Sequence, residues 1–193
     1  MTDLPALILA SSSRYRRQLL ERLNLPFTAI APEVDESATA DETGGELAMR
    51  LAELKASTVA AAHPSALVIG SDQVAECGQR LLGKPGSSAR ALAQLESMQG
   101  RIVVFHTAVA VALGSRVFGE LVPTAVRMRN LNRDTLRRYV DADDPIDCAG
   151  AFKSESMGVV LAEYMRSDDP TALVGLPLIA TLRLLGKFGL ELP

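Results

Sequence analysis

Short apolar runs alternate with longer segments in which hydrophobic residues recur at helical spacing. The run ALILA, residues 6–10, is long enough for a buried strand and too short for a helix. Residues 14–23 then repeat leucine at helical spacing, between serines that favour a helix N-cap and an Asn and a Pro that mark a stop. The chain therefore opens as strand, polar turn and helix.

The alternation continues to the end of the chain. The pattern predicts further helices at about 46–62, 88–98, 132–142 and 176–187, and further strands at 27–31, 66–70, 102–113, 117–128 and 159–164. Gly114-Ser115 separates two of these strands as a hairpin signal. Alternating helices and strands with a hairpin predict an α/β fold with a mixed sheet flanked by helices, and a groove where strand ends gather. A chain of 193 residues suits one ordinary domain or two closely packed lobes.

Composition and charge restrict the classes of function. Hydrophobic residues make up 48% of the chain and Trp is absent, so the core must be built from Ala, Leu, Val and Ile. A formal net charge of -3 argues against broad electrostatic capture of nucleic acid. No apolar run reaches the roughly 20 residues that span a bilayer, and the segment MTDLPALILA lacks the basic flank of a signal peptide. We therefore expect a cytoplasmic protein that binds neither nucleic acid nor membranes.

The cysteines and histidines do not form a metal-binding pattern. Cys77 and Cys148 lie far apart without a CxxC motif, which predicts two free thiols in a reducing compartment. His63 and His106 are equally isolated, so neither a histidine metal site nor a catalytic triad is expected.

The first candidate for chemistry is the turn that follows the first strand, residues 11–17. A helix N-terminus offers unpaired N–H groups, and the hydroxyls of Ser11 and Ser13 add donors for a phosphate. Arg16 and Arg17 supply forked N–H pairs of the kind that grip phosphate oxygens. The alternative is a plain N-cap with a solvated basic face.

Acidic residues form two further candidates. Glu33 and Asp35 alternate in an extended segment, so both can face one site, and paired carboxylates are ligands that Mg²⁺ or Mn²⁺ prefer. The alternative there is an exposed acidic loop. Asp72 is expected at the carboxyl end of the strand 66–70, where α/β folds place ligands, and it could hold a metal or take a proton from water. The alternative for Asp72 is to cap the following turn.

Two small-residue loops carry lysines. In Gly83-Lys84-Pro85 the proline favours an extended backbone, which could aim the ammonium of Lys84 at a phosphate; a surface turn is the alternative. The loop CAGAFKSE carries Lys153 and Glu155, which could reach a phosphate and a base edge respectively. Each motif is ambiguous alone, but basic donors, paired acids and a strand-end Asp are together the parts of a metal-assisted site for cleaving a phosphoanhydride.

The order of these motifs resembles the Maf family of nucleotide pyrophosphatases across essentially the whole chain. The matching segments are LILASSSRYRRQLL, APEVDES, RLAELKA, IGSDQV, GKP, CAGAFKSE and LVGLPL. The resemblance implies one two-lobed domain over residues 1–193, with the Maf and ITPase type of twisted mixed sheet and a central cleft. It also implies an enzyme that cleaves a nucleoside triphosphate between the α- and β-phosphates with a divalent cation, Mg²⁺ or Mn²⁺. Members of the family are often dimeric, so a homodimer is one expectation, although no apolar stripe identifies an interface.

The resemblance also implies roles for particular residues. Asp72 looks like the catalytic acidic residue that accepts a proton from the attacking water, and Asp35, together with Glu33, looks like a metal-side partner. Positions associated with the triphosphate are Ser11, Arg16, Lys55 and Lys84. Without the resemblance, Lys55 would be interpreted as a solvated lysine of an amphipathic helix.

Three positions indicate the branch of the family. The branch that acts on 7-methyl-GTP has an aromatic residue, Gln and Glu where this chain has Tyr15, Gln73 and Glu155, and the branch acting on dTTP and UTP has Arg, Thr and Gln. N7-methylated guanine is positively charged, so an aromatic face and a carboxylate would both favour it. Arg14 replaces a frequent Pro, Tyr15 the Trp common in this branch, and Ser156 the usual Gly.

The expected activity is therefore the conversion of 7-methyl-GTP to 7-methyl-GMP and diphosphate, as a housecleaning reaction of the nucleotide pool. One alternative keeps the chemistry and changes the substrate to dTTP, UTP or another modified nucleotide. Another class of function is a nucleotide-binding regulator of cell division and septum formation.

Overall fold

The computed structural model describes residues 5–192, which form one mixed sheet, the helices around it and the loops that connect them. Residues 1–4, on which part of the expectation about a signal peptide depends, lie outside this range. In chain order the strands and α-helices are β1 (Leu7–Ala10), α1 (Arg14–Glu21), β2 (Phe27–Ala29), α2 (Gly44–Ala62), β3 (Leu67–Cys77), β4 (Arg80–Leu82), α3 (Ser88–Met98), β5 (Ile102–Leu113), β6 (Arg116–Met128), α4 (Arg133–Asp143), β7 (Ala162–Arg166) and α5 (Leu178–Gly186).

The sheet combines parallel and antiparallel pairs. Its strand order is β2-β1-β3-β5-β6-β7, with β4 paired to β3 outside this path. The pairs β1–β2 and β1–β3 are parallel, whereas β3–β4 and β6–β7 are antiparallel. The predicted α/β class with a mixed sheet flanked by helices is confirmed.

Two strands differ from their predicted ranges. The strand expected at 66–70 continues as β3 to Cys77, and its extension pairs with the short strand β4, which the pattern did not predict. Small and polar residues at 70–72 resemble a turn, but here they are buried inside the sheet. The strand expected at 159–164 begins later, because residues 157–161 form a 3₁₀ turn before β7.

The described residues divide into two compact units. Within residues 5–192, the first unit comprises residues 5–72, 107–122 and 169–192, and the second comprises residues 73–106 and 123–168. Strands β3, β5 and β6 each contribute residues to both units. The central cleft implied by the family resemblance stays a prediction.

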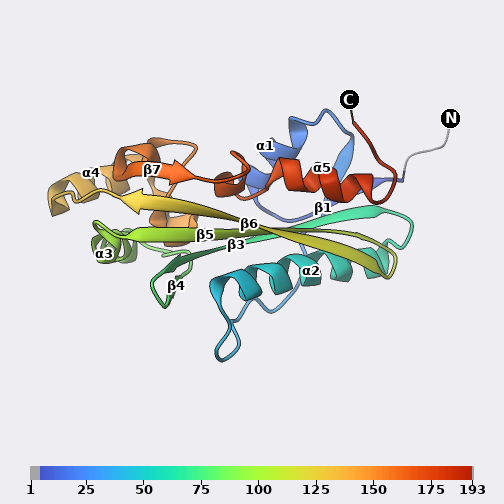
Figure 1. The fold of residues 1–193 in the computed structure, drawn as a ribbon, viewed down its shortest axis with the longest axis horizontal. Coiled ribbons are helices and arrows are strands. Elements are labelled where there is room, and N and C mark those ends of the chain that lie inside the picture. The colour runs from blue at the N-terminus through green and yellow to red at the C-terminus, as the bar shows by residue number, and fades with distance from the viewer. Residues whose placement is uncertain (1–4, 193) are drawn as a thin grey trace. The chain divides into compact units, whose positions relative to one another are not determined.

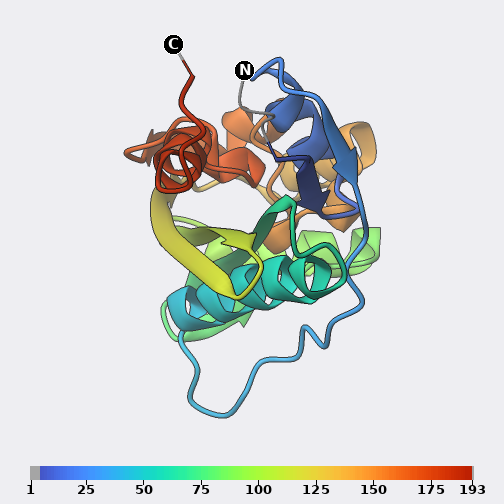
Figure 2. The same ribbon diagram turned by 90° about the vertical axis from the view of Figure 1, so that its right-hand side faces the viewer.

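In the first unit, helices cover both faces of the sheet. Helices α1 and α5 lie on one face and α2 on the other (Figures 1 and 2). The side of α1 and α5 is closed by a cluster of buried aliphatic side chains that includes Leu9, Leu20, Ile69 and Leu184. Each such side chain stabilises the fold by about 1.5–3 kcal/mol when it is fully buried.

Helix α2 packs closely on β3 because Gly70 has no side chain. A Cβ at Gly70 would lie 2.3 Å from the carbonyl oxygen of Ala52 and 2.6 Å from the amide nitrogen of Ala56. Alternate residues of a strand share a face, so Asp72 lies on the same side of β3 as Gly70. The close approach thus presents the middle of α2 to Asp72.

The second unit buries three aromatic side chains in its core. The rings of Phe105 on β5 and Phe152 lie 5.5 Å apart, and Tyr139 of α4 is almost completely buried. The hydroxyl of Tyr139 donates to the carbonyl of Ala151 and accepts from the amide of Lys153. Helix α4 therefore fixes the backbone of the loop that carries Lys153. Among residues 5–192, no helix combines the length and the apolarity needed to cross a membrane.

Candidate active site

The predicted strand, turn and helix at the start of the chain are present. β1 ends at Ala10, opposite Gly70 of β3, and Ser13 caps α1 by accepting a hydrogen bond from the amide of Arg16. The hydroxyl of Ser11 is part of the turn and accepts from the amide of Ser13 at 3.1 Å. The turn therefore follows the carboxyl end of β1, as expected for an anion site in an α/β fold. Both the N-cap and the phosphate-site interpretations remain consistent with this geometry.

Arg16 points into the unit, whereas Arg17 is exposed. The Nε–H of Arg16 donates to the carbonyl of Gly175 at 2.8 Å. Burial lowers the pKa of the Arg16 guanidinium, and the nearby negative charges of Asp72 and Glu36 act in the opposite direction. Because Nε is engaged by the protein, the terminal nitrogens are the groups that can meet an anion.

Asp72 is held by a buried lysine. Lys55 of α2 is only 5% exposed, and its ammonium lies 2.6 Å from Oδ1 of Asp72, which is itself 8% exposed. Asp72 lies inside β3 rather than at its end, contrary to the prediction. The strand end near Asp72 is that of β1, because the pairing of β1 with β3 stops at Gly70, two residues before Asp72.

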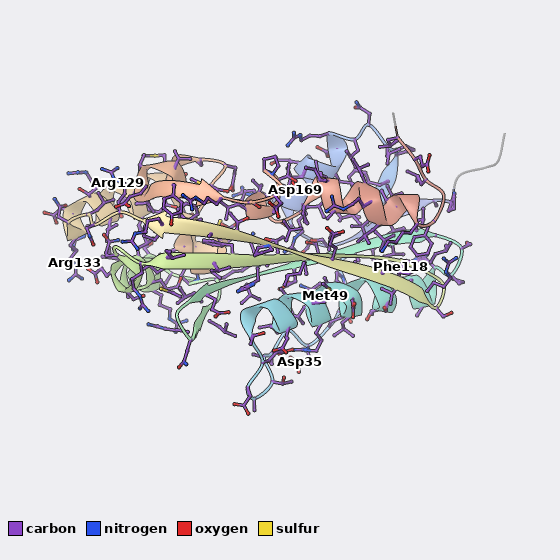
Figure 3. The ribbon with its side chains drawn as sticks, viewed as in Figure 1. Asp35, Met49, Phe118, Arg129, Arg133 and Asp169 are labelled. Atoms are coloured by element: carbon purple, nitrogen blue, oxygen red, sulfur yellow. The ribbon has the colours of Figure 1, made fainter. Side chains whose placement is uncertain are left out.

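The acidic loop reaches this ion pair through Glu36. Oε1 of Glu36 lies 2.6 Å from the same Lys55 ammonium. Glu33 and Asp35 are both exposed, as in the alternative of an exposed acidic loop. Asp35 accepts a hydrogen bond from the amide of Ser37 within the loop (Figure 3). That bond is the main reason why the pKa of Asp35 is lowered.

No three His, Cys, Asp or Glu side chains within residues 5–192 gather as a metal-binding group. Glu33, Asp35 and Asp72 are therefore not a preassembled trio, and their role as ligands stays a prediction. The carboxylates that do lie close together are those of Asp72 and Glu36, which both contact the ammonium of Lys55. Mg²⁺ is commonly bound by one or two carboxylates with phosphate oxygens and water completing its shell, so this pair fits such an ion.

The acidic loop is fastened to α2 by an ion pair that titrates at low pH. Arg50 donates to both carboxylate oxygens of Glu42 and to the carbonyl of Ser37. The hydrogen bond from Arg50 is the largest cause that lowers the pKa of Glu42 to about 2, from an ordinary value of 4.5. The loop that carries Glu36 is thus anchored next to α2.

We expect this anchor to weaken only in acid. Since the folded-state pKa of Glu42 is depressed, its stabilisation is complete above pH 4.5 and is lost as the pH falls toward 2. Proteolysis of the loop by pepsin should accelerate over that range in the wild type. In Glu42→Gln the loop should already be cleaved faster at pH 5, and equal rates at that pH would contradict the anchoring role.

A cavity of about 550 Å³ lies beside the start of α2, away from the Asp72 ion pair. It is lined by Thr39, Ala40, Asp41, Glu42, Glu46, Met49, Arg50 and Glu53. None of these residues belongs to the predicted site, and the acidic lining does not suit a polyphosphate.

In the second unit, the two lysine loops are neighbours. The amide of Gly86 donates to the carbonyl of Ile146, and the amide of Gly150 donates to that of Gly83. Lys84 is exposed between these contacts. The Lys153 ammonium donates to the backbone carbonyl of Asp143 at 2.9 Å. The assignment of both lysines to phosphate stays a prediction.

Asp143 organises the loop that carries Glu155. Its buried carboxylate accepts from the hydroxyl of Ser156 at 2.5 Å and from the amide of Met157 at 3.0 Å. Ser156, which departs from the usual family residue, therefore anchors this loop. Glu155 is exposed as a residue, but partial burial of its carboxyl raises its pKa, and the charge of Lys153 opposes this shift.

The aromatic face at Tyr15 is covered by its neighbour. The guanidinium carbon of Arg14 lies 4.7 Å from the ring centroid of Tyr15, and Nη2 donates to the Tyr15 hydroxyl at 2.6 Å. A positively charged base would have to displace Arg14 to stack on this face. Gln73, the third specificity position, is half-buried in β3.

The structure thus brings together Arg16, Lys55 and Asp72 within the first unit and adds Glu36 to them. Sequence patterns missed Glu36, because strict alternation pointed to Glu33 and Asp35. Asp143 was missed as well, since an Asp near the end of a predicted helix carries no motif of its own.

A family model and several relatives match nearly the whole chain. The family model described as Maf-like protein matches residues 6–188. Proteins named 7-methyl-GTP pyrophosphatase are 52% identical in Bordetella pertussis, over 97% of this chain and 94% of that protein, and 53% identical in Aromatoleum aromaticum, over 97% of both chains. A third, from Xanthomonas oryzae pv. oryzae, is 53% identical over 98% of this chain and its own full length. Among solved structures, a HAM1 protein from Coxiella burnetii matches 65% of this chain and 73% of its own, with 16% identity and a TM-score of 0.45.

Proposed function

Because this chain belongs to the Maf-like protein family, we propose that it hydrolyses 7-methyl-GTP to 7-methyl-GMP and diphosphate. The observation that carries the proposal is the buried Lys55–Asp72 pair in the first unit. Arg16 lies near this pair, since the charge of Asp72 acts to raise the pKa of its guanidinium. A buried acid with two cations beside it has the parts needed to bind a polyphosphate and to accept a proton. The three relatives named above support the choice of substrate.

In this mechanism Asp72 acts as the general base. Its carboxylate takes a proton from the water that attacks the α-phosphorus, and the bond from that phosphorus to the bridging oxygen breaks, releasing diphosphate. Lys55 and the terminal nitrogens of Arg16 meet phosphate oxygens and offset the negative charge that builds up there. Burial strengthens these electrostatic contacts, because little water screens them.

A divalent cation completes the proposal. Asp72 and Glu36 would hold it, and Glu33 and Asp35 are further exposed carboxylates on the same loop as Glu36. A divalent ion held there, Mg²⁺ or Mn²⁺, would supply positive charge that polarises phosphate oxygens. Lys55, which now bridges the two carboxylates, would then donate to phosphate instead.

The family pattern assigns recognition of the nucleobase to Tyr15, Gln73 and Glu155. A carboxylate at Glu155 can accept hydrogen bonds from the N–H edge of guanine and favours a positively charged ring over a neutral pyrimidine. We therefore expect Glu155→Gln to lower kcat/KM for 7-methyl-GTP by about tenfold, the effect of losing one charged interaction. Rates with dTTP and UTP should change little. If Glu155→Gln leaves the ratio of kcat/KM for 7-methyl-GTP to kcat/KM for dTTP and UTP unchanged, Glu155 does not select the nucleobase.

Product analysis tests the reaction itself. 7-Methyl-GTP incubated with the protein and Mg²⁺ or Mn²⁺ should yield pyrophosphate rather than orthophosphate, and chelation of the metal by EDTA should stop the reaction. A panel containing GTP, dTTP and UTP distinguishes the proposed substrate from the pyrimidine alternative. Nucleotide binding without any product would instead favour the regulatory function.

A further inference from the structure

A buried aspartate outside the predicted site ties the segment 169–178 to α5. Asp169 is 1% exposed, and its Oδ2 accepts from the amide of Ile179 at 2.7 Å, in the first turn of the helix (Figure 3). Its Oδ1 accepts from the amide of Thr171 at 2.9 Å. The Thr171 hydroxyl lies 2.7 Å from the same oxygen and accepts from the amide of Leu178 at 2.8 Å. Pro177 precedes α5 and offers no side-chain cap. Asp169 and Thr171 instead accept from the first two amides of the helix, those of Ile179 and Leu178.

The segment held in this way carries the carbonyl that orients Arg16. Gly175 has a φ of +118°, which L side chains rarely adopt, and this conformation turns its carbonyl toward β3 and α1. That carbonyl accepts from Nε of Arg16 at 2.8 Å and lies 2.9 Å from the hydroxyl of Ser71, the neighbour of Asp72. The Gly175 carbonyl oxygen therefore contacts both Arg16, the proposed phosphate ligand, and Ser71, the neighbour of the proposed general base Asp72.

A second contact ties the same segment to the sheet. The hydroxyl of Thr107 on β5 donates to the carbonyl of Ala172 at 2.9 Å. The segment is thus fixed at Ala172 by the sheet and at its ends by α5, with Gly175 between these points. Loss of the Asp169 contacts would detach the segment from α5, while the hydrogen bond between Thr107 and Ala172 would remain.

We propose that Asp169 is a positioning residue, which sets the direction of Arg16 through the Gly175 carbonyl. The inference rests on the proposed function, in which Arg16 binds the polyphosphate. Asp169 itself does not touch the reacting atoms in this mechanism. Its carboxylate is required because two oxygens accept from separate amides, and an amide group at this position would face one of those N–H groups with its own NH₂.

The test is Asp169→Asn, measured alone and combined with Arg16→Lys. We expect kcat/KM for 7-methyl-GTP to fall ten- to a hundredfold in Asp169→Asn, because a small displacement of a binding group has effects of this size. In the Arg16→Lys background, the same substitution should change kcat/KM by less than about twofold, since the group it positions is already lost. Fully additive effects would overturn the proposal.

A readout independent of catalysis is the exchange of the Arg16 Nε–H proton with water, followed by NMR. It should be slow in the wild type and faster in Asp169→Asn. Leu184→Ala, a buried substitution on the same helix, is the matched control: it lowers Tm but should leave both that exchange and KM unchanged. If Asp169→Asn behaves like this control, Asp169 is only a helix cap and the proposal is wrong.

Should Asp169→Asn fail to fold, Thr171→Val and Thr171→Ser serve instead. The valine removes the hydroxyl that accepts from Leu178, whereas serine retains it, so only the valine variant should speed the exchange of the Arg16 proton. Equal exchange in the two variants would overturn the proposal. A wild type that releases no pyrophosphate contradicts the proposed function, while the exchange measurement still decides whether Asp169 orients Arg16.

Discussion

Replacing Asp72 with Asn should reduce the release of pyrophosphate from 7-methyl-GTP by about 10²- to 10⁴-fold, the usual contribution of a general base. The amide has nearly the same shape as the carboxylate but cannot accept a proton from water at neutral pH. Asp72 is buried within β3, so its backbone position is fixed by the sheet and should not move. Initial rates of pyrophosphate formation under saturating substrate measure the effect.

The control for this variant is Asp41→Asn, the same chemical change in the loop before α2. Asp41 is exposed and has a φ of +65°, a conformation that Asn tolerates well. Its rate should equal that of the wild type. Circular dichroism and Tm verify that both variants are folded. A turnover in Asp72→Asn close to that of the wild type would exclude Asp72 from the mechanism.

Lys55→Met should have the second large effect, on stability as well as on activity. Removing the ammonium leaves the buried carboxylate of Asp72 without its partner, and breaking a buried pair in this way costs about 3–5 kcal/mol of unfolding free energy. Glu36 adds little to this figure, because its side chain is 59% exposed and water screens it. We also expect kcat/KM to fall about 10²-fold or more, since one phosphate-binding charge is lost.

Urea denaturation of the single and double variants separates these effects. In Lys55→Met combined with Asp72→Asn, both buried charges are absent, so much of the lost stability should return while activity stays low. This outcome follows from the general finding that an unpaired buried charge is worse than no charge at all. If Lys55→Met alone is as stable as the wild type, the pair does not have the buried character that the mechanism needs.

Much of the helical structure could be predicted from the sequence because local chemistry determines it. Ser13 and Ser87 cap α1 and α3, and the leucines at helical spacing in α1 include the buried Leu19 and Leu20. Strand ends were harder to predict, because whether a strand continues depends on its neighbours. Beyond Gly70, β3 stays in the sheet next to β5, and its last residues, Ala75–Cys77, pair with β4. The polar Ser71 and Asp72 can lie inside the sheet because tertiary hydrogen bonds satisfy them.

For the site, the residue pattern alone pointed to Arg16 and Asp72, whereas Lys55 was identified only through the family resemblance. The burial of Lys55 depends on tertiary packing, because the absence of a side chain at Gly70 lets α2 pack closely against β3. Tertiary contacts also bring Glu36 of the acidic loop to Lys55 and bind Asp169 to the first turn of α5. Such contacts join residues far apart in the chain, and the energy of a buried charge depends on what surrounds it in space rather than on its neighbours in sequence.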